Sequence, residues 1–230
     1  MSARQLVLDL PHRVALGRED FLVGPSNQAA VALIDRWPDW PSSTVILTGP
    51  AGSGKSHLVE VWRQSSGARR AEAPALTREA VPGLIASGNL ALEDLPGEAL
   101  DETALFHLLN LTRQAAAKLL ITATLNPAHW PVRLPDLASR LRALPVVTLG
   151  VPDDSLLRGV LAKLFADRQL TVDDAVLSYL LARMPRSLEA ARRITAEIDA
   201  RALTERSEIN RAFVARVLGE FHAPDLFGDD

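Results

Sequence analysis

The sequence predicts an α/β protein in which a five-stranded parallel sheet is followed by a small all-helical domain. Up to about residue 149, apolar runs rich in β-branched residues alternate with helical patterns, which is typical of strand–helix–strand units. The first clear strand leads into a glycine-rich turn that opens a helix. Beyond residue 152 every periodic segment has helical spacing, so we expect the sheet to end there.

The glycine-rich turn matches the pattern G-x-x-x-x-G-K-[ST] from Gly49 to Ser56, directly after the apolar strand at residues 45–48. Glycines let the backbone wrap closely around a phosphate and point successive N–H groups inward. The following helix adds its amino-terminal donors and dipole. Lys55 would place its charge on the β- and γ-phosphates, and the Ser56 hydroxyl would ligate magnesium. The motif therefore predicts a phosphate-binding P-loop, with an ordinary turn between strand and helix as the alternative.

The remaining segments follow in order. Further strands are expected at residues 68–73, 90–95, 118–124 and 146–149, and helices at 27–37, 101–117 and 135–143. Four more helices are expected between residues 153 and 218. We expect an N-terminal arm at 1–20, an α/β domain at 21–151, a helical domain at 152–219 and a tail at 220–230.

The strand at residues 90–95 carries two acids, Glu93 and Asp94, near its end. Carboxylates at the end of a strand beside a P-loop predict a Walker B arrangement, in which one acid orients the magnesium shell and the other polarises water. We expect Glu93 to share the metal with Ser56; the alternative is an acidic turn. The polar end of the strand at 118–124, Thr124 or the nearby Asn126, could hold the attacking water.

Composition excludes several classes of protein. A net charge of −3 and a pI near 6.0 argue against broad electrostatic binding to nucleic acid. The sequence contains no cysteine, so it has neither a disulfide framework nor a cysteine-based metal site. No apolar run reaches the roughly 18 residues of a membrane span, and the N-terminus lacks a signal-peptide pattern. We therefore expect a soluble cytoplasmic protein.

A short motif lies near the N-terminus. Its residues, Gln5, Leu6, Leu8 and Leu10, suit an extended peptide in which Leu8 and Leu10 enter hydrophobic pockets while Gln5 hydrogen-bonds at the rim. The motif resembles the hexapeptide Q-x-x-L-x-L by which bacterial replication proteins dock on the β sliding clamp. The alternative is a strand or staple packed on the body of the protein.

The whole pattern resembles the AAA+ ATPases, and among them the DnaA-related proteins of the Hda type. Residues 21–27 resemble the nucleotide-pocket segment of DnaA, residues 134–141 the arginine-finger segment, and residues 184–189 the sensor 2 segment. The resemblance implies that Arg140 is the finger and Arg186 the sensor arginine. It implies that ADP or ATP, with magnesium, contacts Leu22, Val23, Gly49, Pro50, Ala51, Gly52, Ser53, Gly54, Lys55, Ser56, His57 and Arg186.

Two features favour the Hda type over DnaA itself: the clamp-like motif at the N-terminus, and the expectation that no DNA-binding domain follows the helical domain. The resemblance implies a negative regulator of replication initiation that binds the β sliding clamp and stimulates hydrolysis of DnaA-bound ATP. The implied partners are the clamp and DnaA, with a homodimer as a further option and no sequence-specific DNA binding. The implied location is the bacterial cytoplasm, at the replisome or nucleoid.

The sequence departs from the family pattern at two points. Glu93 stands where aspartate is usual, and residues 122–127 lack the aspartate that DnaA typically has near Thr124. The longer side chain would disturb a magnesium shell that demands near-ideal geometry, so we predict nucleotide binding with weak or no turnover. The alternatives are a clamp-tethered AAA+ adaptor or a helicase-loader-like ATPase acting on another replication partner. A nucleotide kinase is a further alternative, but it would need a lid for an acceptor substrate, whereas residues 153–218 are expected to form a four-helix lid.

Overall fold

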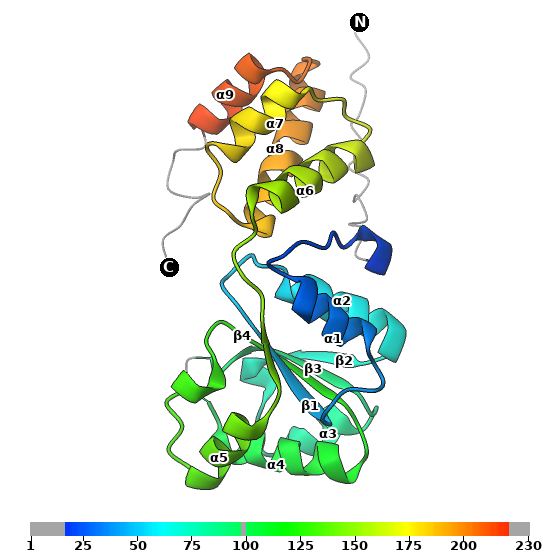
Figure 1. Ribbon diagram of the computed structural model, residues 1–230, viewed down its shortest axis with the longest axis vertical. Coiled ribbons are helices and arrows are strands. Elements are labelled where there is room, and N and C mark those ends of the chain that lie inside the picture. Colours follow the sequence, from blue (N-terminus) through cyan, green and yellow to red (C-terminus); the bar gives the residue numbers. More distant parts are fainter. Residues whose placement is uncertain (1–16, 98–99, 221–230) are drawn as a thin grey trace, which may run out of the picture.

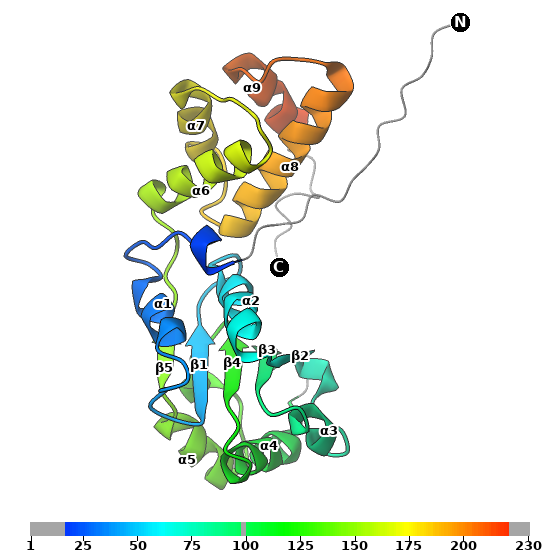
Figure 2. The ribbon, with the colours of Figure 1, turned by 90° about the vertical axis from the view of Figure 1, so that its right-hand side faces the viewer.

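The computed structural model describes residues 17–97 and 100–220. A parallel sheet covered by helices forms one half of the molecule, and a bundle of four helices forms the other (Figure 1). Figure 2 shows the bundle lying beyond the end of the sheet toward which the strands point. The expected fold class, an α/β core followed by an all-helical domain, is confirmed. We call the four-helix bundle the lid.

The sheet contains five strands, all parallel, in the order β2-β3-β4-β1-β5. Their bounds are β1 Thr44–Thr48, β2 Arg69–Glu72, β3 Leu90–Leu95, β4 Leu119–Ala123 and β5 Val146–Thr148. Ile46 in β1 pairs with Ile121 on one side and with Val146 on the other, and every residue of β1 is buried. Strands covered on both faces need such near-continuous apolar runs. The carboxyl ends of β1, β3 and β4 consequently meet at one edge of the sheet.

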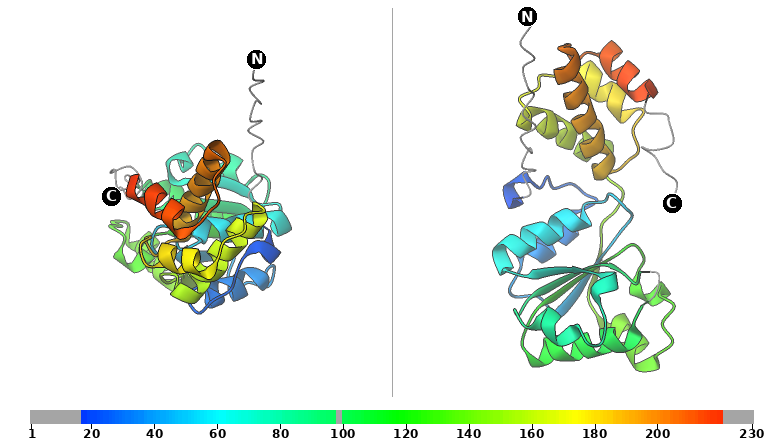
Figure 3. Two further views of the ribbon diagram at one scale, coloured as in Figure 1. Left: turned by 90° about the horizontal axis from the view of Figure 1, so that it is seen from above. Right: turned by 180° about the vertical axis from the view of Figure 1, so that it is seen from behind.

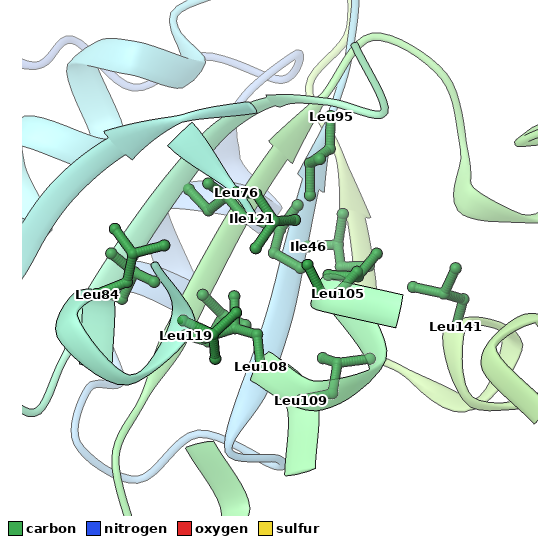
Figure 4. Packing of buried hydrophobic residues seen from close by; sticks show 14 of the residues in the cluster. Ile46, Leu76, Leu84, Leu95, Leu105, Leu108, Leu109, Leu119, Ile121 and Leu141 are labelled. Carbon is green, nitrogen blue, oxygen red and sulfur yellow. The ribbon is translucent and has the colours of Figure 1, made fainter. Parts of the chain in front are cut away.

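Helices cover both faces of this sheet. One face packs against α1 (Gln28–Asp35) and α2 (Lys55–Ser66) through inward residues that include Val45, Leu47 and Leu120. The other face packs against α3 (Val81–Ile85), α4 (Glu102–Gln114) and α5 (Pro135–Ala143), as Figure 4 shows for Ile46, Leu105 and Leu141. Alternate residues of one strand thus enter different cores. Two short 3₁₀ segments, η2 (Ala73–Ala75) and η3 (Pro127–His129), lie in the connections.

The lid contains α6 (Asp154–Asp167), α7 (Asp174–Leu181), α8 (Leu188–Glu205) and α9 (Arg211–Glu220). Its core is separate from the two sheet cores and includes Leu161, Phe165, Val176, Ile198 and Val214. Figure 3 shows the lid from above and from behind. Among the residues described, no helix is long and apolar enough to cross a membrane.

The chain enters the α/β body through a 3₁₀ turn, η1 (Arg18–Asp20). Arg18 pairs with Asp35 at the end of α1 (2.7 Å), and Asp20 pairs with Lys163 on α6 (2.8 Å). Residues 18–20, which the sequence assigns to the N-terminal arm, are thus held to α1 and α6. Both partners are distant in sequence, so no local pattern could indicate these contacts.

Candidate functional site

The P-loop lies between β1 and α2, at the carboxyl edge of the sheet. Gly52 and Gly54 have φ values of 68° and 105°, a left-handed conformation that side chains other than glycine rarely adopt. Gly54 is also the N-cap of α2, so the loop turns directly into the helix. The first N–H groups of a helix have no partner within it. Here they would face an anion held by the loop.

Lys55 is buried beneath the loop. Its Nζ donates hydrogen bonds to the carbonyl oxygens of Gly49 (2.8 Å) and Pro50 (2.9 Å). Burial lowers the pKa of the Lys55 ammonium, and the carboxylates of Asp94 and Glu93 oppose that shift. The charge is therefore held within the loop, where a phosphate would replace the carbonyl partners.

A hollow lies above the loop, and we call it the P-loop hollow. Its lining includes Gly52, Lys55, Ser56 and Asp94 from the body, and Glu189 and Arg192 from α8 of the lid. Ser56 is exposed here, so its hydroxyl is available to a ligand. The structure thus brings the lysine, the hydroxyl and one of the two predicted acids to the same place.

The two acids at the end of β3 have different surroundings. A register shift between Leu92 and Leu95 accompanies a φ of 62° at Asp94, whose N–H donates to Thr122 Oγ1 (3.1 Å). Asp94 is therefore exposed in the hollow, whereas Glu93 is fully buried. A β-bulge re-aims side chains in this way. Thr122, which supports the bulge, was not singled out by sequence because a buried threonine in a strand gives no signal.

Glu93 forms an ion pair with the edge strand β2. Arg70 Nε lies 2.5 Å from Glu93 Oε1, although its N–H does not point along a hydrogen bond. Both Glu93 oxygens are buried without a hydrogen-bond partner among the described residues. Such a carboxylate has free acceptor capacity for a hydrated cation, but the guanidinium already neutralises its charge.

The predicted water-holding residues lie after β4. Thr124 is exposed one residue beyond the strand. Asn126 Oδ1 accepts a hydrogen bond from the N–H of Ala128 (3.0 Å) and so caps η3. Neither residue lines the P-loop hollow. The role of either residue with water stays a prediction, and the capping bond leaves Thr124 the freer of the two.

The lid contacts the P-loop directly. Leu188, the first residue of α8, donates its N–H to the carbonyl oxygen of Gly52 (2.8 Å). Arg192 Nη2 lies 2.7 Å from Nδ1 of His57, the residue that follows Ser56 in α2. Arg186, which the family resemblance assigned to this site, is half-exposed and pairs with Asp154 (2.6 Å) within the lid. Sequence reasoning missed Glu189 and Arg192, although Arg192 lies four residues after Leu188 and three after Glu189, spacings that place it on the same side of a helix as each.

A second hollow adjoins the first, and we call it the apolar hollow. Most of its exposed lining is apolar, contributed by Phe21, Leu22, Val160, Leu164 and Leu188. Polar and charged side chains also line it: Asp20, His57, Lys163, Asp167, Arg168 and Arg192. The Asn27 side chain shapes the entering segment because it donates to the Leu22 carbonyl and accepts from the Gly24 N–H, both at 2.9 Å. Leu22 therefore lines the apolar hollow, whereas Val23 is half-exposed and lines neither hollow.

Arg140 lies on α5, away from both hollows. Its guanidinium stacks over the Phe106 ring (4.5 Å to the centroid) and donates a hydrogen bond to Asn110 Oδ1, both on α4. It does not line the P-loop hollow. The clamp-like residues Gln5, Leu6, Leu8 and Leu10 lie outside the described residues.

No model of a known protein family matches the chain. Among solved structures, domain III of the replication initiation protein DnaA from Thermotoga maritima superposes with a TM-score of 0.76 at 18% identity, covering 94% of this chain and all of that one (100%). AMPPCP-bound DnaA from Aquifex aeolicus gives 0.68 at 16% identity, covering 89% of this chain and 68% of that one. The RuvB branch migration motor from Thermotoga maritima gives 0.67 at 18%, with coverages of 90% and 72%.

The chain shares its fold with these DnaA and RuvB structures. Within this fold, the P-loop hollow lies where the carboxyl edge of the sheet meets the lid. At identities below one fifth, these likenesses concern the fold alone.

Proposed function

We propose that this chain is a nucleotide-binding AAA+ regulator of DnaA, of the Hda type. The observation that carries the proposal is the P-loop hollow, where Lys55, Ser56 and Asp94 face the first turns of α8. A nucleotide would place its phosphates here and its base in the apolar hollow beside Leu22. The AMPPCP-bound state of the DnaA structures supports ADP or ATP as the ligand.

Magnesium would accompany the nucleotide. Mg²⁺ usually takes one or two carboxylates together with phosphate oxygens and waters. The Ser56 hydroxyl and the exposed Asp94 carboxylate are donors of that kind, with Glu93 behind them. When bound, the ion would neutralise phosphate charge.

The surroundings of Glu93 support weak intrinsic turnover. Its carboxylate is buried and paired with Arg70, so reaching the metal shell or a water molecule would require breaking that pair. We therefore propose that the nucleotide mainly holds the chain in a binding-competent shape.

The regulatory step is proposed to act on a partner. Arg140 projects from the α4–α5 side and does not line its own P-loop hollow, so it would serve a nucleotide on another molecule. An arginine finger that neutralises transition-state charge raises hydrolysis by about 10³–10⁵. The nucleotide in question would be the ATP of DnaA, which would become inactive ADP–DnaA.

Docking on the β sliding clamp is proposed for Gln5, Leu6, Leu8 and Leu10. The support comes from sequence alone: a glutamine and leucines spaced for an extended peptide. The α/β body begins at η1, where Arg18 pairs with Asp35 of α1 and Asp20 pairs with Lys163 of α6. The motif therefore lies on the N-terminal side of a segment that two ion pairs hold to the body and the lid. Clamp binding would place the protein at the replisome.

The test is the turnover of DnaA-bound ATP, measured with DNA-loaded clamp present and absent. Wild-type chain is expected to stimulate turnover in a clamp-dependent manner. The double variant Gln5→Ala/Leu8→Ala should lose that dependence, and Arg140→Ala should lose at least about 10³-fold of the stimulation. Arg142→Ala, an exposed arginine on the same helix, is the matched control and should stimulate normally.

The experiment also addresses the alternative of a clamp-tethered AAA+ adaptor, which the paired state of Glu93 equally favours. An adaptor would depend on the clamp motif but not on Arg140. Unchanged stimulation by Arg140→Ala would therefore support the adaptor. Absence of any stimulation by the wild-type chain would contradict a role in DnaA–ATP hydrolysis.

A further inference from the structure

Two arginines near the start of α8 differ in what they face. Arg186 precedes the helix, has a side chain 54% exposed and pairs with Asp154. Arg192 lies about one turn beyond Leu188, is partly buried and lines the P-loop hollow together with Lys55 and Ser56. The arginine that the family resemblance selects is thus not the one that the packing directs to the phosphate loop.

The docking of α8 on the P-loop explains the position of Arg192. The N–H of Leu188 donates to Gly52 O, and the Ser187 hydroxyl lies 1.9 Å from where a Cβ on Gly52 would stand. Glycine is therefore required at 52 for this close approach as well as for its positive φ. Because residues four apart share one side of a helix, fixing Leu188 against the loop also brings Arg192 to it.

The partners of Arg192 leave room for an anion. Within residues 17–97 and 100–220, its side chain hydrogen-bonds to the imidazole of His57 and forms no ion pair with a carboxylate. Burial lowers the pKa of this guanidinium, with Glu189 opposing the shift. A guanidinium carries five N–H donors in a planar fork that matches phosphate oxygens. A partly buried cation whose bonding capacity is mostly unused favours an anionic ligand.

The Arg192–His57 pair also lies between the two hollows, because both residues line each of them. A nucleotide with its base in the apolar hollow and its phosphates on the P-loop would pass beside this pair. The phosphates and the lid would then meet at Arg192.

We infer that Arg192 is the lid cation that binds the phosphate chain of the nucleotide, and that its bond to His57 holds it ready for that contact. The inference rests on the proposed nucleotide binding. It assigns to Arg192 the contact with the nucleotide that the family resemblance implied for Arg186. His57 is then a positioning residue that links the P-loop helix to the lid.

The test compares the affinity of the full chain for ADP and ATP, with magnesium, by isothermal titration calorimetry. Arg192→Gln is expected to weaken both by about 10–100-fold, the range for a charge-assisted hydrogen bond. Arg192→Lys, which keeps the charge but not the fork, should lose less, about 3–10-fold. Arg193→Gln, an exposed neighbour on the same helix, is the matched control and should bind like the wild type.

Two further measurements distinguish a lost phosphate contact from a general structural effect of the substitution. Adenosine binding, followed by ligand-detected NMR, should weaken much less than ADP and ATP binding in Arg192→Gln, because adenosine has no phosphate; an equal loss for all three would assign the residue a general structural role and overturn the inference. Thermal unfolding of each variant checks that it is folded. If Arg192→Gln does not fold, the same comparison is made with Arg192→Lys, and wild-type affinity in that variant would count against the inference.

The outcomes separate the two proposals. Wild-type chain that binds neither ADP nor ATP would overturn the proposed nucleotide binding and this inference together. Wild-type binding with an unaffected Arg192→Gln would overturn the inference alone. A larger loss in Arg186→Gln than in Arg192→Gln would restore the assignment made by family resemblance.

Discussion

Glu93, the first of the two acids at the end of β3, forms an ion pair with Arg70. Glu93 is fully buried on the sheet, and Arg70 from the edge strand supplies the cation beside it. Taking a carboxylate out of water is costly unless a cation compensates for it. Half-exposed Arg70 therefore stabilises the fold by compensating the buried charge of Glu93, the residue that the sequence assigns to the metal site.

The residue-scale prediction concerns Arg70→Met. This change leaves the buried carboxylate without its cation, so we expect a loss of about 1–3 kcal/mol in the free energy of unfolding. The loss should be smaller than for a fully buried pair because water reaches this edge. Urea denaturation at pH 7 measures it. The double variant Arg70→Met/Glu93→Gln removes both charges and should recover most of the loss; equal losses in the single and double variants would contradict the argument.

The helices of the lid begin at side-chain caps. Asp153, Asp173 and Ser187 accept hydrogen bonds from the N–H groups of Leu156, Val176 and Ala190, at the starts of α6, α7 and α8. A cap satisfies one of the four unpaired donors at a helix start. The caps thereby set where three of the four lid helices begin, and with them the residues that face the P-loop.

The element-scale prediction concerns the cap of α7. Asp173→Ala removes an acceptor at 2.8 Å from the Val176 N–H, and we expect it to cost about 1 kcal/mol of stability. Asp173→Ser retains a capping oxygen and should cost no more than a few tenths of a kcal/mol. Thermal or urea unfolding of the two variants provides the comparison. Equal destabilisation by alanine and serine would show that the cap is not the source.

At the scale of the whole molecule, an ion pair joins the entering segment to the lid. Asp20 precedes the first helix of the body, Lys163 belongs to α6, and their side chains meet at 2.8 Å. The hydrogen bond from Lys163 lowers the pKa of the Asp20 carboxyl, against an opposing effect of desolvation. The pair, together with the Leu188–Gly52 bond, fastens the lid to the body.

The corresponding prediction is a pH dependence. Because the pKa of Asp20 is lower in the folded chain than in the unfolded one, its stabilising effect is complete above the unfolded value of about 4. The effect is lost as the pH falls through the folded value. Asp20→Asn should therefore cost roughly 0.5–1 kcal/mol at pH 7 and nothing near pH 2. Urea denaturation across this range tests the sign, and a difference that grows toward low pH would contradict it.

Much of the fold could be predicted because its signals are local. The buried strands are continuous apolar runs, the P-loop needs glycines followed by lysine and a hydroxyl, and the lid helices have apolar residues at helical spacing. The fold class, an α/β core followed by an all-helical domain, follows from these patterns in order. Strand ends were less accurate: the second strand was expected at 68–73 and forms at Arg69–Glu72.

The sequence by itself determined which residues form strands, helices and the phosphate loop, since backbone preference and hydrophobic period act over a few residues. Tertiary structure decided which of Glu93 and Asp94 faces the hollow, which of Arg186 and Arg192 reaches the P-loop, and that residues 18–20 are held to α1 and α6. These outcomes depend on a bulge supported by another strand and on a lid docked on a distant glycine. Such contacts join residues far apart in the chain, and no local pattern encodes them.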